Sequence, residues 1–300
     1  MNILNALSVI VLLSVPSVDS EPRDFQYDGP GLALITPFNI GILAVPWDYG
    51  SALYLEGGKA ARSIPWHWDE STRCSVPSSC GDSAAICINR NALDYIVLFT
   101  SDSLLDLYGP FTNAGMAAFD GFGNIWFTAD GFLYRNGIST EIELESHTVA
   151  VDHSGSRIAF CDSSDRICLL NTSSGESSVL ASDYRFYSPL FVSSGGTVVI
   201  VTSSLEGEIV KVSPDDGTCT SLAEGSMPFW WKEMGVLLYS VTSDDGHTIT
   251  SGEIWKVSLE GENQQITFSS GVHEIHPIAL DVAVFAIDAI TGSLITVPDR

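Results

Sequence analysis

The sequence predicts an all-β chain that forms a single β-propeller. The prediction rests on a repeat of fixed length, on the strand-like content of each repeat and on the lack of helical patterning. Gly155, Gly195 and Gly235 lie 40 residues apart, and Gly123 precedes Gly155 by 32 residues. No stretch shows the amphipathic pattern of about 10–12 residues that helical repeats of similar period require. A period of about 40 residues with four short strands is typical of propeller blades.

Each repeat continues from its glycine through strand-like runs that turn signals separate. The second runs lie at 158–161, 198–201 and 236–239, the third at 166–170, 208–212 and 253–257, and the fourth at 178–180, 219–222 and 264–267. Weaker units occupy 31–64 and 65–113, and the last unit, 276–300, has room for three strands. A sheet of four short strands cannot bury both faces alone, so the units must stack around an axis.

This tally predicts seven blades of four antiparallel strands, with six blades as the alternative because the first two units are weakly marked. Residues 24–27 are expected to supply the missing strand of the last blade, which would close the ring and remove two exposed edges. We therefore expect one β-propeller domain over residues 21–300, after a signal peptide at 1–20.

Residues 1–20 have the pattern of a secretory signal. The apolar run at 6–15 is shorter than the roughly 20 residues that span a bilayer, and the small side chains at 18–20 fit a cleavage site. No lysine or arginine precedes the run, which departs from the usual pattern, and a retained N-terminal anchor is the alternative. The sequence predicts a secreted or periplasmic protein without a transmembrane span.

The charge balance limits the classes of partner. With 37 acidic and 13 basic residues, the chain has a formal net charge of −24. Such a surface repels nucleic-acid phosphates and anionic lipid heads, keeps the protein in solution, and permits calcium or a basic partner. We expect no nucleic-acid ligand, and we expect a monomer.

Six cysteines in an exported chain favour disulfides. Cys74 and Cys80 bracket a short loop, and Cys161 and Cys168 flank a polar turn, so both pairs are predicted to form bridges. The pairing of Cys87 and Cys219 stays open. No Cys-x-x-Cys motif occurs, which disfavours zinc and redox sites.

The later repeats resemble those of TolB-type propellers, which are WD40-like in architecture. The resemblance is carried by Ile254-Trp-Lys-Val-Ser-Leu-Glu-Gly261 with Gln265-Ile-Thr267, by the opening prolines Pro189 and Pro277, and by a degraded Ser-Pro-Asp-Gly tetrad at 152–155 and 192–195. The stretches 120–128 and 131–135 are similar to repeats of regulator-type and lyase-type propellers. The resemblance covers residues 115–300 and implies a fold, but it does not imply an activity.

Aromatic and imidazole side chains recur where the chain enters each innermost strand, and these positions often carry ligands in propellers. The candidate binding residues are Trp66, His67, His147, Tyr187, Trp230 and His276. The alternative is that they fill the axial channel or pack between blades.

Metal and catalytic motifs are weak. His273 and His276 are three residues apart, whereas the helical zinc motif places its histidines four apart. Acidic turns at 162–165, 215–216 and 244–246 lack the spacing of a calcium loop, and there is no Gly-x-Ser-x-Gly elbow and no phosphate-binding loop. We expect no cofactor and no catalytic residues, with calcium or another divalent ion as the alternative.

The sequence thus favours a non-enzymatic module that binds a protein, peptide or glycan through one face. One alternative is a metal-dependent lyase or lactonase with its site on the central axis. Another is a structural component of the cell envelope.

Overall fold

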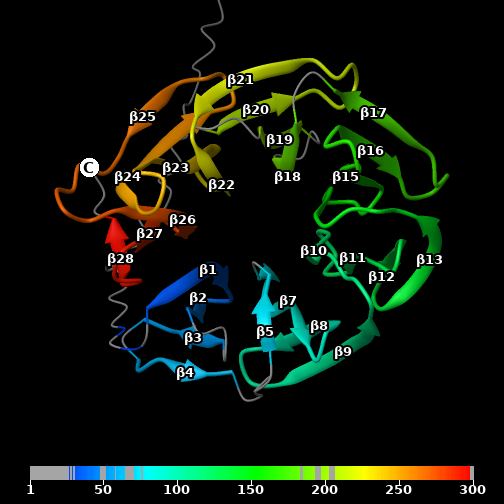
Figure 1. The fold of residues 1–300 in the computed structure, drawn as a ribbon, viewed down its shortest axis with the longest axis horizontal. Coiled ribbons are helices and arrows are strands. Elements are labelled where there is room, and N and C mark those ends of the chain that lie inside the picture. The colour runs from blue at the N-terminus through cyan, green and yellow to red at the C-terminus, as the bar shows by residue number, and fades with distance from the viewer. Residues whose placement is uncertain are drawn as a thin grey trace, which may run out of the picture.

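The computed structural model describes residues 27, 29, 31–47, 52–57, 59–64, 71–75, 77–182, 185–192, 197–202 and 207–297. Within these residues every regular element is a strand, and the strands form seven sheets arranged in a ring (Figure 1). The described part of the chain holds no helix with the length and apolar content of a membrane span.

The first three sheets contain the N-terminal half of the ring. Sheet one has β1 (Leu32–Phe38), β2 (Gly41–Pro46), β3 (Leu53–Leu55) and β4 (Arg62–Ser63). Sheet two has β5 (Ser71–Cys74), β6 (Ser78–Cys80), β7 (Ser83–Arg90), β8 (Leu93–Thr100) and β9 (Leu104–Phe111). Sheet three has β10 (Ala118–Phe119), β11 (Ile125–Ala129), β12 (Phe132–Arg135) and β13 (Ile138–Glu143).

The remaining four sheets complete the ring. Sheet four has β14 (Val149–Val151), β15 (Arg157–Cys161), β16 (Ile167–Asn171) and β17 (Ser177–Ala181). Sheet five has β18 (Phe186–Val192), β19 (Thr197–Thr202), β20 (Glu208–Val212) and β21 (Cys219–Glu224). Sheet six has β22 (Ser226–Trp231), β23 (Val236–Asp244), β24 (Ile249–Ser258) and β25 (Asn263–Gln265), and sheet seven has β26 (Glu274–Leu280), β27 (Ala283–Asp288) and β28 (Leu294–Val297).

Neighbouring strands of each sheet are antiparallel and follow one another in chain order, with the first strand nearest the axis and the last at the outside (Figure 1). Sheet two departs from this pattern because β5 and β6 both pair with β7. The all-β architecture and the stacking of sheets around an axis that the repeat predicts are therefore confirmed.

The apolar core lies between neighbouring sheets, as the stacking argument requires. One cluster joins sheets one and two through Phe38, Tyr54 and Phe99. Another joins sheets seven and one through Leu32 and Phe285, and its continuity shows that the two ends of the described chain meet. Burial of a side chain of this size contributes about 1.5–3 kcal/mol, so these interfaces hold the ring together.

Closure of the ring is only partly described. A backbone hydrogen bond of 2.8 Å from Leu32 N to Gly292 O links sheets one and seven, and Tyr27 packs against their shared cluster. Residues 24–26 of the predicted closing strand lie outside the described residues.

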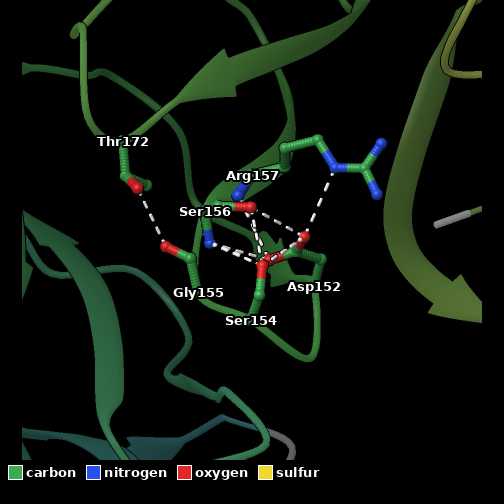
Figure 2. A network of polar contacts seen from close by, with 6 residues as sticks. All are labelled: Asp152, Ser154, Gly155, Ser156, Arg157 and Thr172. Carbon is green, nitrogen blue, oxygen red and sulfur yellow. Dashed lines mark hydrogen bonds and ion pairs between the residues drawn. The ribbon is translucent and has the colours of Figure 1, made fainter. Parts of the chain in front are cut away.

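Aspartates hold the turns between the first and second strands of sheets three and four. In sheet four, Asp152 Oδ1 accepts hydrogen bonds from the backbone N–H groups of Ser156 (2.8 Å) and Arg157 (3.1 Å), and Oδ2 accepts from the Ser154 hydroxyl at 2.9 Å (Figure 2). In sheet three, Asp120 Oδ1 accepts hydrogen bonds from the backbone N–H groups of Phe122 and Asn124, both at 2.9 Å. Its Oδ2 also accepts from Trp126 Nε1 at 3.1 Å. The turn of sheet four is the degraded tetrad at 152–155, and the turn of sheet three belongs to the stretch 120–128. The aspartates of both turns stabilise the fold.

The structure corrects the predicted disulfides, because Cys80, Cys161 and Cys168 carry free thiols. Cys161 pairs with Ile167 across the sheet and Cys168 pairs with Phe160. Directly opposed residues share a face of the sheet, and successive residues alternate, so the two thiols point to opposite faces.

The predicted Cys74–Cys80 bridge fails for a different reason. Cys74 pairs with Ile88 and Cys80 with Ser83, five residues apart along β7. That separation is about 17 Å in a strand, whereas a disulfide requires Cα atoms within about 7 Å. The side chain of Cys74 lies outside the described residues. Cys87 and Cys219, whose pairing was left open, lie in sheets two and five.

Candidate functional site

One end of the ring carries the loops that lead into the innermost strands and the turns between second and third strands. We call this end the loop face and the opposite end the far face. Backbone hydrogen bonds join the loops and turns of the loop face to each other, including Asp130 N to Asn113 O (2.9 Å), Met116 N to His147 O (2.8 Å) and Phe186 N to Asp165 O (2.8 Å). The loop face of sheets three to five is therefore a connected surface.

A cavity of about 800 Å³ opens on this surface, and we call it the acidic pocket. Its walls are the loops at 112–115 and 144–148, the turns at 128–131 and 161–165, and Phe186. Four carboxylates line it, from Asp130, Glu145, Asp162 and Asp165. No lysine or arginine is among its described lining residues, so the pocket carries net negative charge.

A second cavity of about 360 Å³ lies beside the acidic pocket on the side of sheet two. Gly115 and His147 line both cavities, so the two are adjacent. A buried carboxylate, Asp94, lines the smaller cavity and accepts hydrogen bonds from Asn89 Nδ2 (2.6 Å) and Ala114 N (2.9 Å).

Gly115 brings the backbone of the loop at 112–116 close to the next sheet. A Cβ atom at this position would lie 2.5 Å from Thr128 Oγ1 and 2.9 Å from His147 O. Both distances are shorter than real Cβ contacts, so only glycine fits. This close approach sets His147 on the boundary between the two cavities.

The four pocket carboxylates differ in the hydrogen bonds that they make with the rest of the chain. Asp130 Oδ1 accepts hydrogen bonds from the N–H groups of Thr112 (2.9 Å) and Asn113 (3.1 Å). Burial acts to raise the pKa of Asp162, but hydrogen bonds from Arg166, whose Nη2 lies 2.6 Å from Asp162 Oδ2, outweigh it and hold that pKa below its usual range. Glu145 and Asp165 are exposed, and their side chains make no hydrogen bond or ion pair with another described residue.

Cys161 lies in the wall of the acidic pocket. Burial, followed by the negative charge of Asp165, raises the pKa of the Cys161 thiol to about 12. Burial and Asp162 likewise raise the pKa of Cys168 to about 11. Both thiols are therefore protonated at neutral pH, and neither is an activated nucleophile.

The predicted site residues fall in several places. His147 lines both cavities of the loop face, whereas His276 lines the axial channel. Trp230 packs into the core between sheets five and six. Trp66, His67 and the side chain of Tyr187 lie outside the described residues. The structure thus separates the two described histidines into different cavities.

Sequence reasoning missed the acidic pocket residues Asp130 and Glu145 and the buried Asp94. The Asp130-Gly131 pair gives a turn signal, and Glu145 stands four residues before a predicted innermost strand. Neither signal shows that the two carboxylates share a pocket, because the pocket forms only when neighbouring sheets meet.

The predicted metal motifs are placed as follows. Among the described residues, no group of three or more His, Cys, Asp or Glu side chains is positioned to hold a metal ion. The acidic turns use their carboxylates as caps: Asp216 Oδ1 accepts from Thr218 N at 3.0 Å, and Asp245 Oδ1 accepts from Thr248 N at 2.8 Å. His273 precedes β26, and its backbone N–H donates to Asp288 Oδ1 at 3.2 Å.

Comparison with known proteins yields structures but no sequence relatives. No protein-family model and no curated protein sequence matches the chain. The WD40 domain of Toxoplasma gondii coronin matches with a TM-score of 0.61 and 13% identity, over 93% of this chain and 86% of that chain. An oligogalacturonate lyase from Vibrio parahaemolyticus matches with a TM-score of 0.56 and 10% identity, over 89% of this chain and 86% of the lyase.

Two larger proteins match over only part of their length. The chain covers 50% of a prolyl endopeptidase at a TM-score of 0.54 and 10% identity, and 90% of this chain is aligned. It covers 28% of the tricorn protease, with a TM-score of 0.47 and 14% identity over 85% of this chain. At such identities a likeness speaks for the fold alone, because propellers host unrelated functions. The structure and the matches to the coronin WD40 domain and the oligogalacturonate lyase together show that the chain has the β-propeller fold.

Proposed function

We propose that the protein is a binding module that takes a basic peptide segment of a partner on its loop face. The observation that carries this proposal is the pair of adjacent cavities, about 800 and 360 Å³, that share Gly115 and His147. Both lie within the size range of ligand sites, roughly 300–1,000 Å³. Together they offer an extended segment a path across sheets two to five.

Charge selects the kind of peptide. The exposed side chains of Glu145 and Asp165 make no hydrogen bond with another described residue, so they are available to lysine or arginine side chains of a ligand. The net charge of −24 adds a long-range field that speeds the approach of a basic partner. We favour a peptide over a glycan because the described pocket lining has four carboxylates and neither lysine nor arginine.

The proposal includes export, which rests on the signal-like pattern of residues 1–20 alone. These residues lie outside the described part of the chain. An exported propeller would meet its partner outside the cytoplasm, and the experiment below does not depend on that location.

The test compares labelled peptides of alternating lysine and alanine with peptides of alternating glutamate and alanine, by fluorescence anisotropy. We expect the lysine peptide to bind, and its Kd to rise with salt because exposed charges are screened. The double variant Glu145→Gln/Asp165→Asn should weaken binding about tenfold, which corresponds to roughly 1.4 kcal/mol. The matched control, Glu176→Gln/Asp215→Asn, makes the same chemical changes at exposed turns elsewhere and should bind as the wild type does.

Equal binding of both peptides, or equal loss in the two double variants, would overturn the proposal. A rise in melting temperature on adding manganese or calcium, reversed by a chelator, would favour the metal-dependent enzyme instead, because a ligand of the folded state must stabilise it.

A further inference from the structure

A cavity of about 580 Å³ follows the axis of the ring, and we call it the axial channel. Each of the seven described sheets contributes lining residues from its innermost strand or from the residues beside that strand. The lining is mostly apolar and includes Ile35, Phe119, Val151, Phe191, Phe229 and Ile278. Its volume is within the range of small-molecule sites, roughly 300–1,000 Å³.

The polarity of the channel limits what it can hold. Among its described lining residues there is no lysine, arginine, aspartate or glutamate. A charged ligand would lose its hydration without gaining a partner, which is costly. An uncharged ligand with large apolar surface would gain from burial instead.

His276 is the one imidazole among the described residues that line the channel. Burial lowers the pKa of His276, so the ring is neutral at pH 7. A neutral imidazole has one N–H donor and one nitrogen acceptor. Neither makes a hydrogen bond with another described residue, so both are available to a polar group of a ligand.

The backbone holds His276 in place through an unfavourable conformation. His276 has a φ of 51° and Met227 a φ of 55°, and each precedes a proline. In both strands the register shifts at this point, between Ile275 and Ile278 and between Ser226 and Phe229. Such bulges redirect side chains, and left-handed backbone at residues other than glycine costs about 1 kcal/mol or more each. Two adjacent innermost strands therefore bear this cost where they face the channel.

We infer that the axial channel binds a small, uncharged aromatic molecule with one hydroxyl group, and that His276 anchors this hydroxyl. An aromatic ring suits the flat faces of Pro189, Pro228 and Pro277 and the thioether of Met227, since sulfur–aromatic contacts are favourable. The inference does not rest on the peptide site, because the channel shares no lining residue with the acidic pocket and only Met116 with the smaller cavity.

The test uses p-cresol and p-xylene, which have nearly the same shape and differ by a hydroxyl group in place of a methyl group. Binding to the full chain is measured by isothermal titration calorimetry. We expect p-cresol to bind about tenfold more tightly than p-xylene, the effect of one hydrogen bond. His276→Ala should remove this preference and leave p-xylene binding unchanged.

Two further variants keep the test decisive if His276→Ala folds poorly. His276→Asn preserves a hydrogen-bonding side chain and suits a positive φ, so it should retain part of the preference. Ala118→Phe, which adds a ring to the channel lining, should abolish binding of both compounds while the protein remains folded by circular dichroism. The control is His247→Asn in the exposed turn of sheet six, which should behave as the wild type.

No binding of either compound by the folded wild type would overturn the inference. So would a preference for p-cresol that survives His276→Ala, or binding that survives Ala118→Phe.

Discussion

The two ends of sheets three and four carry aspartates in tight turns, but the surroundings of these aspartates differ. At the far face, Asp120 and Asp152 are 3% and 6% exposed, and each accepts hydrogen bonds from its own turn. At the loop face, Asp130 and Asp162 are bonded in the same way, but the exposed side chains of Asp165 and Glu145 make no hydrogen bond or ion pair with another described residue. A carboxylate whose acceptor positions are filled from within holds the fold, whereas an unfilled one is available to a ligand.

The largest effect expected from this comparison is on the rate at which the Cys161 thiol is alkylated. The pKa of about 12 places the Cys161 thiolate roughly a thousandfold below that of an ordinary thiol with a pKa near 9. Iodoacetamide should therefore label Cys161 in the native protein far more slowly than it labels glutathione at pH 8, as followed by mass spectrometry. Labelling at the glutathione rate would show that the pocket wall is neither buried nor negative.

Among effects on stability, the far-face aspartates should give the largest. Asp120→Ala removes the acceptor for Phe122 N (2.9 Å), Asn124 N (2.9 Å) and Trp126 Nε1 (3.1 Å), and leaves these donors without a partner. We expect a loss of about 3 kcal/mol in the free energy of unfolding, measured with urea. Asp120→Asn keeps an acceptor oxygen and should lose less.

The same aspartate should show a matching pH dependence. Burial acts to raise the pKa of Asp120, but hydrogen bonds from Asn124 and Trp126 outweigh it and leave the pKa lowered. The contribution is therefore present above the unfolded pKa, about 3.9, and is lost as pH falls through the folded value. The gap between wild type and Asp120→Ala should narrow below about pH 4. A gap that stays constant down to pH 2 would show that Asp120 acts by shape and not by charge.

A buried carboxylate with one unpaired oxygen should show the opposite dependence of stability on pH. Glu274 is 1% exposed, its Oε2 has no partner among the described residues, and burial raises its pKa. The ionised form is disfavoured in the folded state, so the penalty grows as pH rises above the unfolded pKa of about 4.3. Glu274→Gln should stabilise the protein by about 1 kcal/mol at pH 8 and by nothing at pH 3. A destabilised variant at pH 8 would contradict this.

The smallest stability effect should come from the loop face itself. Glu145→Gln/Asp165→Asn should change the free energy of unfolding by less than about 0.5 kcal/mol, because neither side chain bonds to another described residue. A loss above 1 kcal/mol in urea titration would place these carboxylates with the structural ones and remove the contrast.

The fold was predictable because the repeat constrains it strongly. Of the three glycines spaced 40 residues apart, Gly155 and Gly235 lie in turns between first and second strands, and Gly195 lies outside the described part. The three-strand last unit also matches β26 to β28. The register of strand pairing within a sheet was harder to predict, because a shift of one residue moves every side chain to the opposite face of the sheet. That is why the Cys161–Cys168 bridge looked plausible in sequence and is absent in the structure.

The site was less predictable than the fold. His147 and His276 were selected because both precede or begin an innermost strand, but sequence did not show that one meets the loop face and the other the channel. Trp230 was selected as a neighbour of these positions, but it lies near the end of β22 and packs between sheets five and six. Whether a side chain near a strand start faces the axis or a neighbouring sheet depends on local bulges, such as the shift between Ser226 and Phe229. Bulges of this kind have only weak sequence signals.

The most direct test of the account is amide hydrogen exchange with and without the lysine–alanine peptide. The loop face of sheets two to five should gain protection at residues 112–116, 145–148 and 162–166, where the two cavities lie. The far-face turns at 121–124 and 153–156 should exchange at unchanged rates. Protection at the far face, or at neither end while the peptide binds, would contradict the assignment of the ligand site to the loop face.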